Sequence, residues 1–113
     1  NLCDFLPGSS EIVYKPTKIC IAGIRFKIEY CDMDGLLGLF LPGDNIIKIC
    51  NGLSDEERFS TLMHECIHAI FDITGNAYSI NDSAKEESIV RALENLFFAV
   101  FIREYEKTRT TKT

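Results

Sequence analysis

The stretch Ser54–Gly75, SDEERFSTLMHECIHAIFDITG, contains both histidines of this 113-residue chain and decides how its second half folds. Ser54 followed three residues later by Glu57 is a capping-box pattern, which marks the beginning of a helix. Apolar residues then recur every three or four positions as far as Thr74, and the glycine after it is a typical helix end. The sequence therefore predicts one long amphipathic helix from Ser54 to about Thr74.

His64 and His68 are four residues apart, so on this helix they lie on one face, one turn from each other. At this spacing two imidazole nitrogens can reach a single Zn²⁺ at about 2.0–2.1 Å. Glu65 follows the first histidine, and in an H-E-x-x-H pattern this glutamate is the general base that acts on a metal-held water. Cys66 points to the opposite side of the helix, and we assign it to the core. The motif predicts a zinc-dependent hydrolytic site.

A second helix is expected further along the chain, over residues 84–107. GNAYSIND, residues 75–82, has the composition of a connecting loop, and Ser83 with Glu86 repeats the capping-box pattern. Apolar residues at helical spacing form the expected core stripe of this helix: Val90, Leu93, Phe97 and Val100 or Phe101.

The third metal ligand has to be a carboxylate or a cysteine, because the chain has no further histidine. The second helix offers three glutamates. Glu87 precedes the core residue Val90 by three positions and therefore points toward the first helix, Glu86 precedes it by four, and Glu94 follows it by four. Acidic residues near a helix start are also favoured by the helix dipole alone. The spacing leaves the ligand open among the three glutamates.

The first half of the chain has the pattern of short strands. Residues 18–22 precede a glycine, and residues 24–30 alternate apolar and charged side chains, as in a half-buried hairpin strand. Pro42-Gly43-Asp44-Asn45 is a turn signal between two further strands, the second at Ile46–Cys50. We expect one α+β domain over 1–113, a small antiparallel or mixed sheet packed on two main helices. Residues 1–16 are an irregular lead-in, and 108–113 are a frayed tail.

The composition of the chain indicates which binding partners and which cellular compartment to expect. The net charge is −5, which argues against direct contact with nucleic acid or with acidic membranes. No apolar run reaches the roughly 20 residues of a membrane span, and residues 1–10 lack the pattern of a signal peptide. The five cysteines show no C-x-x-C spacing. We expect a cytoplasmic protein whose cysteines are reduced and buried: Cys3, Cys20, Cys31, Cys50 and Cys66.

TLMHECIHAIFD together with KEESIVRALENLFFAVF resembles the small gluzincin-type metallopeptidase-like proteins often encoded by bacteriophages, a minimal zincin fold. The resemblance extends over roughly Gly38–Ile102. It implies His64 and His68 as metal ligands, Glu65 as the catalytic glutamate, and a glutamate of the next helix, best matched by Glu87, as the third ligand. It also implies Zn²⁺ as the cofactor and a protein or peptide as the substrate, cut in the host cytoplasm if the protein is phage-encoded.

The same resemblance suggests further roles. An extended peptide is expected to add to a sheet edge beside the motif helix, at Leu39–Leu41 or at Ile46–Cys50. Tyr78 is a candidate donor to the oxyanion, and Arg91 a candidate partner that orients Glu87. The first hypothesis is a zinc peptidase. The alternative is a zinc-containing interaction module that binds or inhibits a host protein without cutting it.

Overall fold

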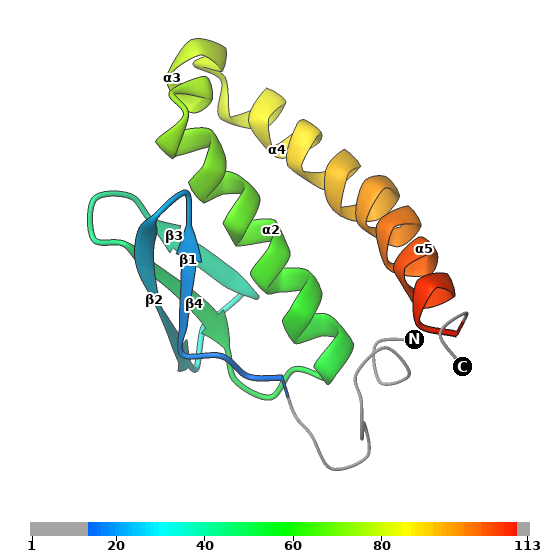
Figure 1. Ribbon diagram of the computed structural model, residues 1–113. Coiled ribbons are helices and arrows are strands. Elements are labelled where there is room, and N and C mark those ends of the chain that lie inside the picture. Colours follow the sequence, from blue (N-terminus) through cyan, green and yellow to red (C-terminus); the bar gives the residue numbers. More distant parts are fainter. Residues whose placement is uncertain (1–13, 111–113) are drawn as a thin grey trace.

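The computed structural model describes residues 14–110 of the chain, with side chains as far as 108. It confirms an α+β fold. Helix α2 lies between a small sheet on one side and a long C-terminal helical segment on the other (Figure 1). The elements in chain order are β1 (Lys18–Ile21), β2 (Ile24–Cys31), β3 (Gly38–Leu41), β4 (Ile46–Cys50), α2 (Asp55–Ile73), α3 (Asn76–Ile80), α4 (Ser83–Ala92), the π-helical turn η1 (Leu93–Phe97) and α5 (Phe98–Thr110).

The sheet is mixed and has the strand order β1-β2-β4-β3. β1 and β2 form the expected antiparallel hairpin, with Ala22 and Gly23 both at positive φ in the tight turn between them. β3 and β4 form a second antiparallel pair around the expected turn at 42–45, and β2 runs parallel to β4. β4, a nearly continuous apolar strand, is therefore central, and β3 is an edge strand.

One face of the sheet packs on α2. In β2 and β4, alternate residues point to this face and are almost fully buried: Phe26, Ile28, Ile47 and Ile49. From the helix they meet Leu62, Cys66 and Ala69, which form the opposite side of the core cluster. The residues between them, Lys27 in β2 and Lys48 in β4, carry charge. The period of two predicted for β2 is confirmed.

Helix α2 has the termini that the sequence predicts. The Ser54 hydroxyl accepts from the Glu57 amide at 3.1 Å, and the Glu57 carboxylate accepts from the Ser54 amide at 3.1 Å. At the other end Gly75 has φ 79°, a left-handed conformation that a side chain at this position would strain. These two ends fix the length of the helix, and its buried apolar residues place one face on the sheet.

The connection between α2 and α4 differs from expectation. Residues 75–82 were expected to be a loop, but Asn76–Ile80 form one short helix, α3. Asp82, not Ser83, caps α4: its Oδ1 accepts from the amides of Ala84 and Lys85 at 3.0 and 3.1 Å. Aspartate caps a helix as well as serine does, and beginning one residue earlier leaves Glu86 free to contact other elements.

The core stripe expected in the second helix is largely wrong. Val90 is fully buried and Leu93 half-buried, but Phe97, Val100 and Phe101 are 57, 48 and 55% exposed. The cause is the π-helical turn η1. Its extra residue shifts by about one residue the positions of the following helix α5 that face α2. Phe98 and Ile102 therefore take the places facing α2, in a groove that Phe59 and Met63 also line.

The two ends of the chain are described only in part. Residues 1–13, most of the expected lead-in, and 111–113 lie outside the described part. α5 is helical as far as Thr110. Within 14–110 no helix combines the length and apolarity that a bilayer crossing requires.

The cysteines are less uniform than expected. All four that the structure describes are free, but Cys20 is exposed and Cys31 and Cys50 are half-buried. Cys3 lies outside the described residues. Cys66 is in the core, as predicted, where burial raises the pKa of its thiol to about 12. Such a thiol is a poor metal ligand, because the ligand is the thiolate.

Replacing Gly38 with alanine should destabilise the fold by about 1–3 kcal/mol, the usual cost of overpacking. A Cβ at this position would lie 2.6 Å from Thr61 Cγ2 and 3.2 Å from the Glu65 carboxylate. Denaturant unfolding measures the loss. The double variant Gly38→Ala/Thr61→Ser, which removes the clashing methyl group, should recover most of it. Equal stability of wild type and Gly38→Ala would show that β3 does not approach α2 so closely.

Candidate metal centre

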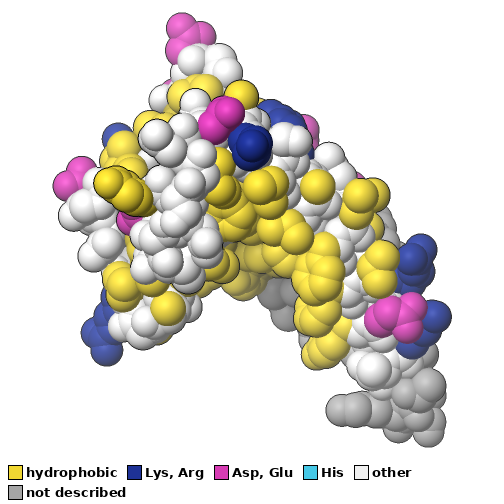
Figure 2. All heavy atoms as spheres, turned by 90° about the horizontal axis from the view of Figure 1, so that it is seen from above, with side chains coloured by type: hydrophobic (Ala, Val, Ile, Leu, Met, Phe, Trp, Pro, Cys, Tyr) yellow, Lys and Arg dark blue, Asp and Glu magenta, His cyan; other side chains and the backbone are white. Residues whose placement is uncertain are grey.

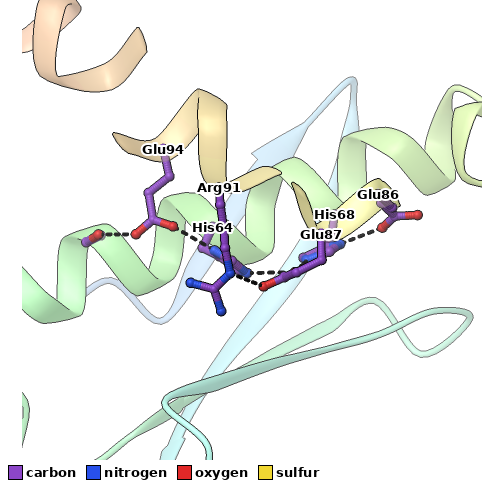
Figure 3. Close-up of polar contacts among 7 residues, drawn as sticks. His64, His68, Glu86, Glu87, Arg91 and Glu94 are labelled. Carbon is purple, nitrogen blue, oxygen red and sulfur yellow. Dashed lines mark hydrogen bonds and ion pairs between the residues drawn. The ribbon is translucent and has the colours of Figure 1, made fainter. Parts of the chain in front are cut away.

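His64 and His68 project from the middle of α2 toward α4, on the side of α2 away from the sheet core (Figure 3). Their ring centroids are 5.1 Å apart, as expected for residues one turn apart on a helix. Both imidazoles are partly buried, with side chains 15 and 20% exposed. The two rings do not splay apart, which is the first requirement of a shared metal.

Glu87 lies between the two rings. Its Oε1 is 2.9 Å from His68 Nε2 and 3.3 Å from His64 Nε2. The two imidazoles and this carboxylate form the one group of potential metal ligands within the described residues, with all three donor atoms inside 4.8 Å of one another. Of the three glutamates left open by the spacing, the structure places Glu87 with the two Nε2 atoms (Figure 3).

The other two glutamates contact the opposite nitrogens of the same rings. His68 Nδ1 donates to Glu86 Oε2 at 2.5 Å, and His64 Nδ1 donates to Glu94 Oε1 at 2.7 Å. The Ser60 hydroxyl in turn donates to the second oxygen of Glu94 at 2.5 Å. A carboxylate on Nδ1 holds the tautomer in which Nε2 is free to bind a metal, and it makes the imidazole more basic.

The electrostatics of the cluster follow from these contacts. Burial lowers the pKa of His68, but the hydrogen bonds that its ring donates to Glu86 and Glu87 outweigh this effect, so the pKa is raised overall. Burial opposes ionisation of Glu87, yet His68, His64 and Arg91 lower its pKa overall. The expected contact between Arg91 and Glu87 is present, with Nε 3.0 Å from Oε2. Glu87 is therefore held as a carboxylate.

Glu65 lies on the neighbouring face of α2 and is only 8% exposed. Burial raises the pKa of its carboxyl, against the opposing effect of His64 and His68. Within residues 14–108 no hydrogen bond or ion pair engages this carboxylate, although it lines the same cleft as both histidines. A buried, unengaged carboxylate with a raised pKa is suited to accept a proton.

A cleft of about 650 Å³ opens beside these residues. One wall includes the histidines and glutamates of α2, α4 and η1, and the other is formed by residues 35–40 with Pro42, in and around β3. The two expected sites of peptide addition are thereby distinguished. β3, which contains Leu39–Leu41, is an edge strand beside the cleft, whereas Ile46–Cys50 is the central strand β4 and is paired on both sides, so that alternative is wrong.

Tyr78 does not belong to this site. It is 89% exposed on α3, and only its neighbour Ala77 lines the cleft. Conversely, the sequence patterns did not point to Ser60 or Gly38. Ser60 precedes His64 by four residues, a spacing that places both on one face of α2. Gly38 carries no such signal, because only the packing of β3 on α2 brings it to Glu65.

The donor set fits a divalent metal of the zinc type. Two imidazole nitrogens and one carboxylate oxygen, with further carboxylates on the outer nitrogens, are the ligand types and supporting contacts of hydrolytic zinc sites. The atoms that converge are the two Nε2 atoms and one Glu87 oxygen, while Glu86 and Glu94 remain on the outside.

Substitutions should separate the ligand from its supporting carboxylates. Glu94→Gln and Glu86→Gln should each weaken zinc affinity by about 10–100-fold, the range for groups that orient a ligand histidine. Glu87→Gln should weaken it more than either. Competitive titration against a chromogenic chelator measures all three, with Glu104→Gln on α5 as the control. Equal losses in all variants would contradict the assignment of Glu87 to the inner position.

Comparison of this chain with protein-family models, with curated proteins and with solved structures gives no match. The function of this chain is therefore inferred from the geometry of its site.

Proposed function

We propose that the protein is a zinc-dependent peptidase that hydrolyses a protein or peptide bond in the cleft between α2 and β3. The observation that supports this most directly is the convergence of His64, His68 and Glu87 beside Glu65, a buried carboxylate that no other group of the described chain engages. A structural zinc site has four protein ligands and no need of a free base, whereas this group has three ligands and a base.

The roles of the residues follow from their positions. Zn²⁺ held by His64, His68 and Glu87 would lower the pKa of a bound water and polarise a carbonyl group. Glu65 accepts a proton from the attacking water, whose oxygen forms the new bond to the carbonyl carbon. It then delivers that proton to the amine as the C–N bond breaks. Glu86 and Glu94 hold the imidazoles in position, and Arg91 holds Glu87.

The substrate is best accommodated as an extended chain along β3. The outer edge of this strand is unpaired within residues 14–110, and its backbone lies beside Glu65 at Gly38. An added strand gains backbone hydrogen bonds without requiring a deep pocket, which suits a domain of this size. This supports a peptide rather than a small molecule as the substrate.

The direct test is metal content followed by cleavage. Protein purified without chelator is analysed for bound metal, then incubated with an unstructured protein with Zn²⁺ and with excess chelator, and products are mapped by mass spectrometry. We expect one zinc per chain and chelator-sensitive cleavage. Absence of zinc uptake would contradict the proposal. Zinc uptake without cleavage of any of several substrates would favour the alternative, a zinc-containing module that binds a protein without cutting it.

A further inference from the structure

A row of apolar side chains on the C-terminal helix remains exposed and is not part of the metal centre. Within the described chain it consists of residues in η1 and α5 that are 45–68% exposed: Leu96, Phe97, Val100, Phe101 and Tyr105. We call it the C-terminal stripe. Figure 2 shows hydrophobic side chains gathered along one face of this helical arm. None of these residues lines the cleft.

The stripe is ordered along the helix axis. Phe97, Phe101 and Tyr105 recur every four residues, and consecutive rings stack, with centroids 6.4 Å apart in each pair and interplanar angles of 19° and 16°. Residues four apart form a ridge of the kind that packs into the groove of another helix. The π-helical turn places this ridge outward, because it assigns Phe98 and Ile102 to the contact with α2.

We propose that a second copy of this chain covers the stripe, in a two-fold symmetric dimer with antiparallel α5 helices. The exposed area supports a stable interface. At 150–250 Å² for a whole aromatic side chain, the stripe exposes on the order of 500 Å² of apolar surface. A stable dimer buries about 800 Å² per partner, of which roughly 60% is apolar, so the stripe supplies the apolar part of such an interface.

The charges of α5 select the antiparallel arrangement. Arg103, Glu104 and Lys107 are exposed along this helix. In a parallel pair each would face its own copy, and like charges at close range are destabilising. In an antiparallel pair with Phe101 on the two-fold axis, Phe97 faces Tyr105 of the second copy. In this register Arg103 faces Ala99, Glu104 faces Phe98 and Lys107 faces Asn95, so none of these three residues meets a like charge.

Sedimentation velocity of the full chain across about 1–100 µM, a range in which many interfaces of this size dissociate, tests the dimer. We expect a reversible monomer–dimer equilibrium in the wild type. Phe101→Asp should weaken it at least about a hundred-fold, because the change occurs in both subunits at the centre of the interface. Tyr78→Asp, the same kind of change at an aromatic residue outside the stripe, should leave it unchanged. Thermal unfolding and zinc titration of both variants serve as the control that they remain folded.

The orientation has its own test. Phe97→Lys and Tyr105→Glu should each weaken self-association. The double variant Phe97→Lys/Tyr105→Glu should associate more tightly than either single variant, because in the antiparallel pair each introduced lysine faces the introduced glutamate of the second copy. In a parallel pair like charges would meet, so a double variant weaker than both single variants would overturn the antiparallel pairing. A wild type that stays monomeric would overturn the dimer. The same holds if the monomer binds phosphatidylcholine vesicles, because a lipid surface would then cover the stripe in place of a second copy. A dimer that Phe101→Asp leaves intact would also overturn the proposal.

Discussion

Replacing Glu65 with glutamine is expected to reduce peptide hydrolysis by at least about 10²–10⁴-fold, the contribution of a positioned general base. Glutamine has the same shape but cannot take the proton from the attacking water. Zinc affinity should change little, because the inner group consists of His64, His68 and Glu87. The measurement is the cleavage rate at equal zinc occupancy. This combination, bound metal with lost cleavage, distinguishes a catalytic base from a structural acid.

Glu65→Gln should also affect the stability of the folded protein. Burial raises the pKa of the Glu65 carboxyl, so its ionised form is disfavoured in the folded protein relative to the unfolded chain. Stability is then lost as the pH rises above the ordinary pKa of a glutamate, and glutamine removes this loss. The metal-free variant should unfold at the same temperature as wild type or higher near neutral pH. Glu56→Gln, an exposed position on the same helix, is the control for both measurements. Undiminished cleavage by Glu65→Gln would remove Glu65 from the mechanism.

His68→Ala is expected to abolish stabilisation by zinc. A ligand that binds only the folded state at about 100 times its Kd stabilises it by roughly 2.7 kcal/mol. At roughly 4 °C per kcal/mol for a domain of about 100 residues, this raises the Tm by about 10 °C. The wild type should show this shift on adding zinc. The variant should not, because His68 supplies one of the two nitrogens and is the partner of both Glu86 and Glu87.

Asp72→Ala provides the control for that experiment. Asp72 lies one turn further along α2, is exposed and lines the same cleft, but it does not belong to the ligand group. Its variant should retain the full zinc-dependent shift in Tm. A shift that persists in His68→Ala would mean that zinc binds elsewhere on the protein, and it would contradict the assigned centre.

Local chemistry determined a large part of the structure. The capping box at Ser54, the helical spacing of apolar residues and the glycine at 75 are effects within one element, and α2 has the expected bounds. The alternation in residues 24–30 likewise depends only on the period of a strand. The relation of His64 to His68 belongs to the same class, since one helical turn fixes it wherever the helix packs.

The assignment of the three glutamates required the tertiary structure. From spacing alone, Glu86, Glu87 and Glu94 all point toward α2. Spacing gives the direction of a side chain around its own helix, but not its position along the neighbouring helix or its distance from it. Packing of α4 and η1 on α2 places Glu87 at the two Nε2 atoms and the other two glutamates at the Nδ1 atoms. The cap at Asp82 contributes, because it frees Glu86 from the capping box that the sequence suggests.

The sequence by itself determined the motif helix, the strands and the pair of imidazoles, since each depends on interactions a few residues apart. Only the tertiary structure decided which carboxylate meets both rings, which strand lies at the sheet edge, and which side of the last helix is exposed. The π-helical turn at Leu93–Phe97 is an example of this difference. It adds one residue that a regular helical period does not predict, and Phe97 and Phe101 are thereby turned outward.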